Sequence, residues 1–431
     1  MHSRVRGRLF GAGIVASALV ASIPMGTAAQ VDAAVTVPGV TSQSITVGAL
    51  VTQSGFLAAD FTPVLDGVRA YFSQVNAKGG VNGRTIDLKY PLDDASNPFS
   101  DSALLHTLVE QDHVFAIVGV ASGFFNAPYL AGTKTPTFGF ATTGGWSPAP
   151  NLFAAYGSYS DALASLPAIE YAVKKNGGTK VGLVAYNQAS SSGECSTLAD
   201  QFPKQYLAVA VKDLSIAYGT TNLTSDATRM KNAGVDAVVS CLDVNGNLAF
   251  ERALASAGLS SAPSLWLDGY DRNLLTRYPD LYANVTLMLQ HVPFEAATEF
   301  PNAYPGLNAY LAQMLATAPS STYAETALEG WLSAALFVAG LQKVGPTFTQ
   351  ASLVKAINGI TNFTGGVTTP VDWRSAHKKT IPPGCSAFVR ASGTHFQLAF
   401  NTGKNPWVCF PAGTTVNLAK PVLPPKGTPG L

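Results

Sequence analysis

The sequence predicts an α/β protein made of two similar Rossmann-like lobes, each with a parallel sheet. Three observations support this class. Short apolar runs typical of buried strands alternate with amphipathic helical patterns along most of the chain. The alternation forms two arrays of like size, one before about residue 145 and one after about residue 158. Helices connect successive strands, and such crossovers make neighbouring strands parallel.

The first array opens with one strand–helix–strand unit. Ser44–Val51 is apolar and is predicted as a buried strand. From about Pro63 an amphipathic pattern predicts a helix that ends at Lys78-Gly79-Gly80, where glycine supplies a left-handed cap. After a Gly-rich turn, apolar residues alternate in Ile86–Tyr90 as in a strand, and the acidic turn Asp93–Pro98 ends the unit.

This order of features resembles the opening of a known family. A hydrophobic strand is followed by Ser-Gly, a helix ending in Asn-Ala-Lys-Gly-Gly, then Asn-Gly-Arg, a strand and Asp-Asp-Ala. The same order is typical of the periplasmic solute-binding proteins of ABC transporters that bind leucine, isoleucine and valine. A weaker resemblance extends to about Phe400. It implies the class I periplasmic-binding-protein fold, in which a three-segment hinge joins two lobes that close on a ligand.

The resemblance also implies how the chain is divided. We expect the hinge crossings near residues 155–157, 289–293 and 364–371. The expected segments are a signal peptide (1–34), the first lobe (35–155 and 290–364), the second lobe (156–289 and 365–410) and an extended tail (411–431).

Other elements follow from the same patterns. The first array continues with helix Phe99–Gln111, strand Phe115–Val120, a short helical segment Phe124–Leu130 and strand Thr137–Phe140. The second array has helices Tyr159–Asn176, Glu194–Tyr206, Leu223–Asn232 and Leu248–Gly258, and strands Lys180–Tyr186, Val209–Leu214, Ala237–Ser240 and Ser264–Leu267. After residue 300 we expect helices Thr322–Val344 and Gln350–Asn358 and a hairpin of Ser386–Arg390 and His395–Phe400. Glu325 and Glu329 interrupt the first of these helices, which favours a packing helix over a membrane span.

Composition and the N-terminus indicate an exported protein. The 431 residues carry a formal net charge of +1 without a basic patch, which argues against nucleic-acid binding. Arginines, a short apolar core and Thr27-Ala28-Ala29 predict a cleaved signal peptide over a retained anchor, so no membrane span is expected afterwards. No cysteine precedes Cys195, so a lipobox cysteine is lacking and a secreted or periplasmic location is expected.

The four cysteines suit an oxidising compartment. They are isolated in sequence and lack histidine partners, which favours disulfides over a zinc site. Of three connectivities we favour Cys195–Cys241 with Cys385–Cys409, because each bond then closes the shortest loop. Four buried thiols are the alternative.

No pattern typical of an enzyme is found. The nucleophile elbow, the phosphate loop, the dinucleotide fingerprint and the His-Glu-x-x-His motif are all absent from the sequence. The six histidines are scattered singly, so no metal or cofactor is expected. Asp93 and Asp94 could suggest paired acid/base catalysis, but turn chemistry and an N-cap for the next helix are favoured.

The resemblance places a ligand anchor in the first lobe. In the amino-acid-binding relatives, a serine after the third strand and an Ala-x-Thr after the fourth hold the ligand carboxylate. Ser122-Gly123 matches the first position to within one residue, and Ala141 and Thr143 match the second. The alternative for Thr143 is a helix cap. Phe124, directly after Gly123, suggests an apolar or aromatic ligand body beside this anchor, although loop aromatics more often pack than bind.

The second lobe departs from the family pattern. Ser192 stands where relatives carry a tyrosine, and Asp243 stands where an aromatic residue is expected. The glutamate that pairs with the ligand ammonium is absent from residues 266–271, where Asp268 or Asp271 could replace it and Tyr270 could add a contact. These departures argue against a simple amino-acid ligand.

The interpretation is therefore a binding protein without catalytic activity. We expect it to capture a small amino-acid-like molecule, an apolar or aromatic carboxylate, or an amide for an ABC permease. A ligand sensor on the same fold and a secreted hydrolase are the alternatives.

Overall fold

The computed structural model describes residues 36–141, 144–159, 162–379, 384–411 and 416–430. The chain divides into a short unit, Met1–Thr36, and a large unit, Val37–Leu431, and both lobes belong to the large unit. The signal peptide predicted for residues 1–34 lies outside the described residues. Among the helices that are described, none is long and apolar enough to cross a membrane.

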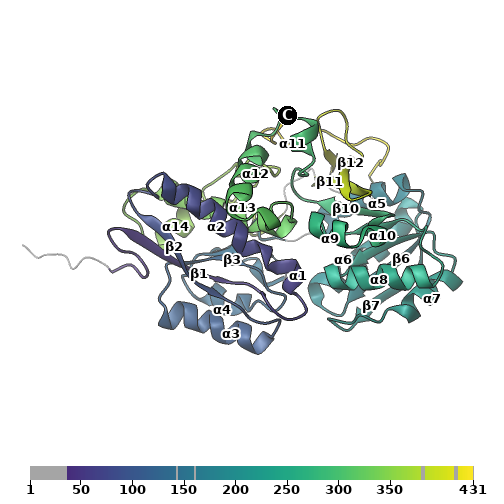
Figure 1. The fold of residues 1–431 in the computed structure, drawn as a ribbon, viewed down its shortest axis with the longest axis horizontal. Coiled ribbons are helices and arrows are strands. Elements are labelled where there is room, and N and C mark those ends of the chain that lie inside the picture. The colour runs from purple at the N-terminus through teal and green to yellow at the C-terminus, as the bar shows by residue number, and fades with distance from the viewer. Residues whose placement is uncertain (1–35, 142–143, 160–161, 380–383, 412–415, 431) are drawn as a thin grey trace, which may run out of the picture. The chain divides into compact units, whose positions relative to one another are not determined.

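The first lobe is built on a parallel sheet (Figure 1). Its strands run in the order β2-β1-β3-β4-β5, and every pairing is parallel, as predicted. The strands are β1 (Ser44–Leu50), β2 (Thr85–Leu92), β3 (Ala116–Val120), β4 (Thr137–Gly139) and β5 (Leu152–Ala154). β3 and β4 are buried along their whole length, as is usual for the centre of a parallel sheet covered on both faces.

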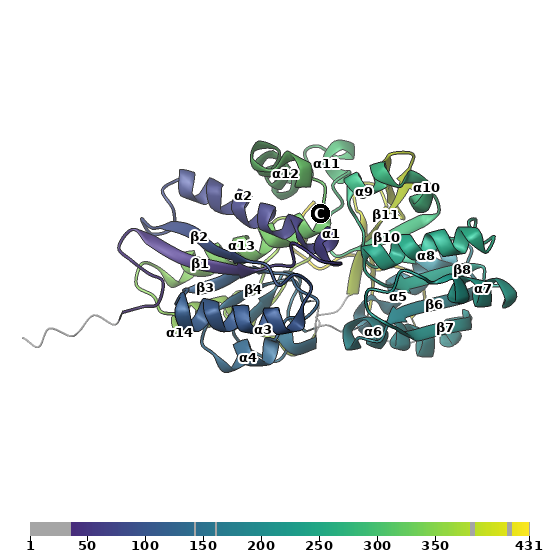
Figure 2. The same cartoon turned by 60° about the horizontal axis from the view of Figure 1, so that its bottom comes forward.

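Helices cover both faces of this sheet (Figure 2). On one face lie α2 (Pro63–Ala77) and α13 (Glu325–Val344), and on the other α3 (Pro98–His106) and α4 (Ala127–Gly132). The first lobe also contains α1 (Ala58–Phe61), α12 (Pro305–Thr317) and α14 (Gln350–Ile357), and α11 (Ala296–Glu299) precedes α12. α13 is largely buried, which confirms that its apolar sequence packs inside the protein.

Two glycines allow α2 and α13 to approach closely. A Cβ at Gly67 would lie 1.8 Å from the carbonyl oxygen of Ala327, and a Cβ at Gly330 would lie 2.0 Å from that of Val64. Since no larger residue fits either place, the two backbones touch. This contact fixes α13, which carries Glu325 and Glu329, on the sheet.

The second lobe has a larger sheet, in the order β12-β11-β10-β9-β8-β6-β7 with β13 paired to β11. Its parallel part is β6 (Lys180–Tyr186), β7 (Ala208–Ile216), β8 (Ala237–Cys241), β9 (Ser264–Trp266) and β10 (Val285–Leu289). The predicted hairpin forms the antiparallel edge as β11 (Gly384–Ser392) and β12 (His395–Ala399), joined by β13 (Trp407–Phe410). One face packs against α5 (Ala162–Lys175) and α6 (Ala189–Gln201), and the other against α7 (Thr224–Asn232), α8 (Val244–Ser256), α9 (Arg272–Arg277) and α10 (Pro279–Tyr282).

Several predicted boundaries differ from the structure. The strand pattern did not identify β5 or β10, which are only three and five residues long. The helix expected to begin at Glu194 begins at Ala189. Serine and glycine fill its first turn, so the apolar periodicity on which the prediction relied is not visible there. The helix expected to reach Gln111 changes at Thr107 into a π-helical turn, Thr107–Gln111. Short 3₁₀ turns occupy Gly144–Trp146, Phe202–Gln205 and Pro319–Ser321.

Both predicted disulfides are confirmed, and the alternative of four free thiols is wrong. Cys195–Cys241 joins α6 to the end of β8, and Cys385–Cys409 joins the neighbouring strands β11 and β13. Both bonds therefore reinforce the second lobe.

The C-terminal residues lie against the body of the large unit. Val422 forms a backbone bridge with Cys409, and Thr428 is buried. A Cβ at Gly430 would lie 2.2 Å from the ring of Tyr304.

Candidate functional site

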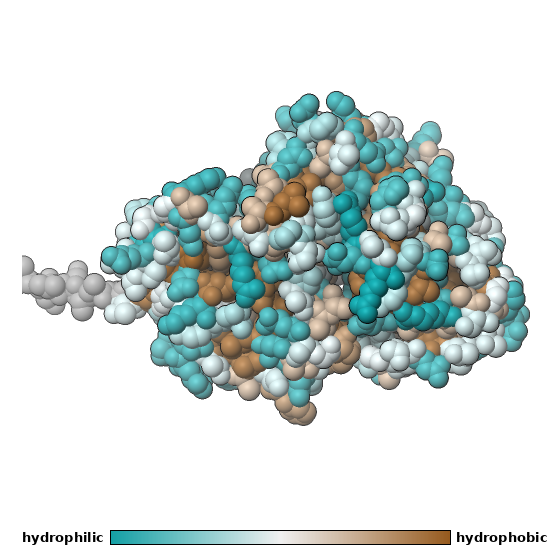
Figure 3. Space-filling view, viewed as in Figure 1, coloured by the Kyte–Doolittle hydropathy of each residue, from teal (hydrophilic) through white to brown (hydrophobic). Residues whose placement is uncertain are grey.

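Loops from both lobes meet where the parallel strands end. In open α/β sheets, ligands bind beyond the carboxyl ends of the strands. A cavity of about 480 Å³ lies there, with Gly55, Phe56 and Ala59 of the first lobe on one side and residues of the second lobe, including Tyr186, Asp243 and Asn245, on the other. On the face drawn in Figure 3, strongly hydrophilic residues gather over α8, which continues the wall of this cavity.

Direct contacts tie the lobes together beside the cavity. The backbone N–H of Val244 donates to Asp60 Oδ1 at 3.2 Å, and Asn245 Nδ2 donates to the carbonyl oxygen of Phe56 at 2.6 Å. Tyr218, in the loop after β7, packs edge-on against Phe56, with ring centroids 5.1 Å apart. These contacts bring α1 onto the N-terminus of α8.

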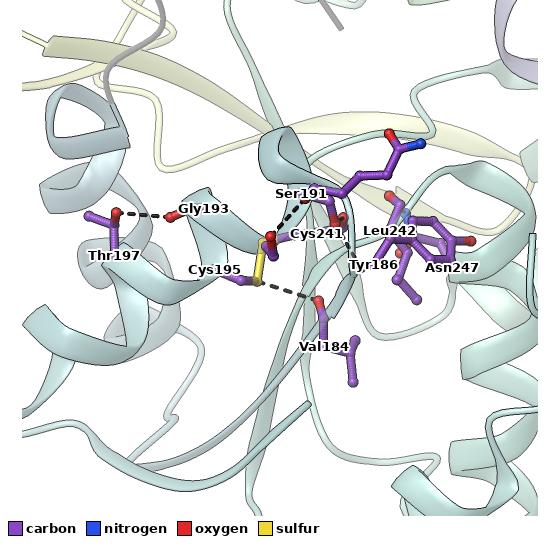
Figure 4. The surroundings of a disulfide bond; sticks show 11 residues. Val184, Tyr186, Ser191, Gly193, Cys195, Thr197, Cys241, Leu242 and Asn247 are labelled. Carbon is purple, nitrogen blue, oxygen red and sulfur yellow. Dashed lines mark hydrogen bonds between the residues drawn. A yellow bond between two sulfur atoms is a disulfide. The ribbon is translucent and has the colours of Figure 1, made fainter. Parts of the chain in front are cut away.

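The disulfide Cys195–Cys241 supports the second-lobe wall (Figure 4). Next to it, Ser191 Oγ donates to the carbonyl oxygen of Cys241 at 2.6 Å and accepts from the N–H of Tyr186 at 2.8 Å. The ends of β6 and β8 are thereby held in register. The side chains that follow these ends, Tyr186 and Asp243, form a hydrogen bond of 3.1 Å.

The predicted first-lobe anchor has internal partners. Ser122 is fully buried, its hydroxyl donates to Asp94 Oδ2, and its oxygen accepts from the N–H of Phe124 at 3.0 Å. Gly123 lies under Tyr218, because a Cβ there would be 2.5 Å from the Tyr218 hydroxyl. Ala141 is half-buried after β4, and Thr143 lies outside the described residues.

Asp93 and Asp94 act in the turn, as predicted. Asp94 Oδ1 accepts from Thr52 Oγ1 at 2.6 Å, and Asp93 Oδ1 accepts from the N–H groups of Gln53 and Ala95, each at 2.9 Å. Asn97 caps α3, as expected for this turn. Both carboxylates are fully engaged in holding the first-lobe loop.

In the second lobe, the predicted residues fall into two groups. Ser192 Oγ donates to the carbonyl oxygen of Gln188, and Tyr270 is buried, with its hydroxyl donating to Glu295. Asp271 caps α9. The side chains of Ser192, Tyr270 and Asp271 therefore all form hydrogen bonds within the protein.

Asp243 and Asp268 form the other group. Asp243 Oδ1 caps α8 by accepting from the N–H of Gly246 at 2.7 Å, but its Oδ2 is buried and has no hydrogen-bond partner among the described residues. Asp268 lines a void of about 10 Å³ with Asp60, Asp271 and Glu325. Of the two aspartates that the sequence offered in residues 266–271, Asp268 faces the first lobe's carboxylates.

Three carboxylates of the first lobe were not predicted as site residues: Asp60 on α1, and Glu325 and Glu329 on α13. Asp60 and Glu329 are buried, and Glu325 is half-buried with one oxygen 3.4 Å from His291 Nε2. The sequence contained a signal for Glu325 and Glu329, because charged residues are rarely buried in an apolar helix without a specific role. It contained no such signal for Asp60.

Burial and mutual repulsion perturb these acids. Burial, followed by the charges of Asp268 and Asp243, raises the pKa of Asp60 well above its usual range. Burial, with the charges of Glu325 and Asp243, raises the pKa of Asp268 to about 7. Burial and the charge of Glu325 also raise the pKa of Glu329. Within the described chain, no group of three or more His, Cys, Asp or Glu is arranged to hold a metal ion.

The sequence and the fold both match known proteins. Residues 44–395 match the periplasmic binding protein family. A search of curated proteins finds no match.

Several solved structures have the same fold. A fatty acid ABC transporter substrate-binding protein from Thermomonospora curvata is 18% identical, with a TM-score of 0.71, covering 91% of this chain and 97% of its own. A solute-binding protein from R. palustris in complex with benzoate is 20% identical, with a TM-score of 0.67, and the match covers 86% of this chain and 98% of that protein. A possible leucine/isoleucine/valine-binding protein from Rhodopirellula baltica SH 1 is 16% identical, with a TM-score of 0.68, and the match covers 85% of this chain and 98% of that protein.

Proposed function

Because the chain belongs to the periplasmic binding protein family, we propose that it captures a small molecule between its two lobes and delivers it to the permease of an ABC transporter. The observation that carries this proposal is the cavity of about 480 Å³ with walls from both lobes. Its size suits a small molecule. A ligand there contacts both lobes at once, so its binding energy favours the arrangement in which the lobes touch.

We also propose which residues contact the ligand. The proposed contacts are Gly123, Phe124, Asp243 and Asp268, together with Ala141 and Thr143, and of these Asp243 lines the cavity. Ser122, Ser192 and Tyr270 act as positioning residues, since their hydroxyls already bond to protein groups.

The proposed protein acts outside the cytoplasm and changes no covalent bond of its ligand. Cleavage of residues 1–34 releases the mature chain. The two disulfides suit this location, because such bonds persist in oxidising compartments. The segments predicted as lobes and hinge are part of the same proposal. In this proposal the segments that cross between the lobes act as a hinge. A backbone bridge between His291 and Thr368 joins two of these segments.

Two experiments test the function. Small molecules that co-purify with the native protein are extracted by denaturation and identified by mass spectrometry. A thermal-shift panel of amino acids, carboxylates, amides and amines then measures which class raises the melting temperature, since a ligand that binds only the folded state stabilises it. We expect at least one class to bind, and cells that lack the protein to lose uptake of that class. A protein that binds no small solute and whose loss leaves uptake unchanged would contradict the proposal.

A further inference from the structure

Six carboxylates from both lobes gather where α1 meets α8. Asp60 and Glu325 of the first lobe line one small void with Asp268 and Asp271 of the second. Asp243 lies beside them at the N-terminus of α8, and Glu329 follows Glu325 by one helical turn. The N–H of Val244, the residue after Asp243, donates to Asp60 Oδ1 at 3.2 Å, which places these two carboxylates side by side.

The buried acceptors of this group lack donors. Asp60 Oδ2 and Asp243 Oδ2 are buried without a hydrogen-bond partner in the described chain. Asn247 adds a third, because its Nδ2 donates to the carbonyl oxygens of Leu242 and Asp268, which leaves its fully buried Oδ1 unpartnered. Native proteins rarely leave buried polar atoms unsatisfied, and all three atoms are acceptors when the carboxyl groups are ionised. What is missing is a donor.

The protein's own cations are used elsewhere. Arg272 pairs with Glu295 at 3.2 Å and stacks on the ring of Tyr323. His291 Nε2 lies 3.4 Å from Glu325, and its Nδ1 donates to the carbonyl oxygen of Val292 at 2.9 Å. In the parts of the chain that the structure describes, no Lys, Arg or His nitrogen lies within 4 Å of a carboxylate oxygen of Asp60, Asp243, Asp268 or Glu329.

Aromatic rings border the same place. Phe56 and Tyr186 line the large cavity together with Asp243. Phe124 and Tyr218 extend this aromatic surface, with Tyr218 4.9 Å from Tyr186 and 5.6 Å from Phe124 between ring centroids. Aromatic faces attract organic cations and pack against apolar groups. The large cavity and the small acidic void share Ala59 in their walls, so the two spaces lie next to each other.

We propose that the captured molecule is an organic cation, an amine or guanidine with an apolar or aromatic body. Its charged nitrogen donates to Asp60 and Asp268 in the acidic void and to Asp243 at the wall of the cavity, and its body lies against Phe56 and Tyr186. This inference rests on the proposed function and specifies its ligand class. It replaces the carboxylate anchor expected at Ser122, whose hydroxyl is bonded to Asp94. The R. palustris relative carries benzoate, a ligand of the opposite charge.

Benzylamine and benzoate make a matched pair of probes, because they share a ring and differ in charge. Binding to the purified protein is measured by calorimetry and thermal shift, with phenethylamine, agmatine and putrescine as further amines. We expect at least one amine to bind and benzoate not to bind. Binding of benzoate or a neutral amide without any amine overturns the cation inference but leaves the binding function intact. Stabilisation by Ca²⁺ or Mg²⁺ without any amine overturns it too, and binding of nothing contradicts both proposals.

Asp60→Asn separates a ligand role from a structural one. The amide keeps the acceptor for Val244 N–H and removes a charge from the crowded cluster, so the ligand-free protein should melt at a higher temperature. Amine affinity should fall by about 10- to 100-fold, because a charge-assisted hydrogen bond is lost. Asp280→Asn, at an exposed site on α10, is the control and should change neither quantity. An Asp60→Asn protein that binds the amine as tightly as the wild type overturns the inference.

Discussion

Tyr218 shows how single residues decide what the two lobes can hold. It belongs to the second lobe, yet its ring packs on Phe56 and Phe124 and its hydroxyl covers Gly123. The sequence did not identify it, because it lies in a loop without a motif. Phe124, in contrast, could be predicted from its place directly after a strand. Sequence patterns reveal residues at strand ends, but not the residues that the other lobe brings to them.

Replacing Tyr218 should weaken both ligand binding and folding. Tyr218→Ala removes two aromatic contacts between the lobes, each worth about 0.5–1.5 kcal/mol, so the affinity for a bound amine should fall about tenfold. Calorimetric titration with benzylamine measures this. The free energy of unfolding should fall by about 1–3 kcal/mol, because the same two ring contacts are present without ligand. Tyr206→Ala, at a highly exposed ring, is the matched control, and equal affinities of the two variants would count against a role for Tyr218 between the lobes.

At the scale of the element, strand and helix periodicity predicted most of the fold. β6 has the predicted bounds, and α2 begins at the predicted Pro63 and stops just before the glycines that end it. Such elements are long and periodic. Short elements are recognised less reliably: β4 and β9 were predicted, but β5, which is equally short, was not. The close contact between α2 and α13 could not be predicted from the sequence either. Gly67 and Gly330 are ordinary helical glycines in sequence, and only the packing of α2 on α13 gives them a role.

Gly67→Ala should destabilise the protein by about 2 kcal/mol, because the added methyl group meets the α13 backbone. Urea unfolding monitored by circular dichroism measures the change. Gly193→Ala is the control: this glycine also lies in a helix, but nothing surrounds its Cβ position, so stability should stay the same or rise by up to about 1 kcal/mol. If both variants lose the same stability, the close contact of α2 with α13 is not the cause.

The disulfide between α6 and β8 should contribute about 3 kcal/mol to the stability of the second lobe. The double variant Cys195→Ala/Cys241→Ala should therefore unfold at lower urea concentration than the wild type. It should also keep one disulfide, which alkylation and intact mass can count. An unchanged midpoint would show that this bond adds nothing to the folded state.

For the whole molecule, both the two-lobe fold and the buried acids have consequences. The fold class and the family could be predicted from the sequence, because strand–helix order is a local property. The acidic cluster could not, since Asp60, Asp243, Asp268 and Glu325 come from four separate segments and meet only when the lobes do. The carboxylate ligand inferred from the relatives' anchor residues stays a prediction.

The buried acids should make the protein less stable in mild alkali. The pKa values of Asp268, Glu251 and Glu170 are raised to about 7, chiefly by burial, so the folded state holds protons that the unfolded chain has released. Stability is therefore lost as pH rises through about 7. Burial lowers the pKa of His377 to about 4, which acts in the opposite direction, but only below about pH 6.5. From pH 6.5 to 8.5 the free energy of unfolding should fall by about 1–2 kcal/mol. Melting temperatures across this range measure it, and an upward trend would contradict the assignment.

Hydrogen exchange with and without ligand tests most directly whether the protein captures a small molecule between its lobes. The exchange of backbone amides is followed by mass spectrometry on the purified protein, using the small molecule that gives the largest thermal shift. We predict slower exchange in the first-lobe segment 52–61 and, at the same ligand concentration, in the second-lobe segments 243–247 and 268–271, because one ligand holds both lobes. Protection confined to one lobe, or spread evenly over the chain, would contradict capture between the lobes.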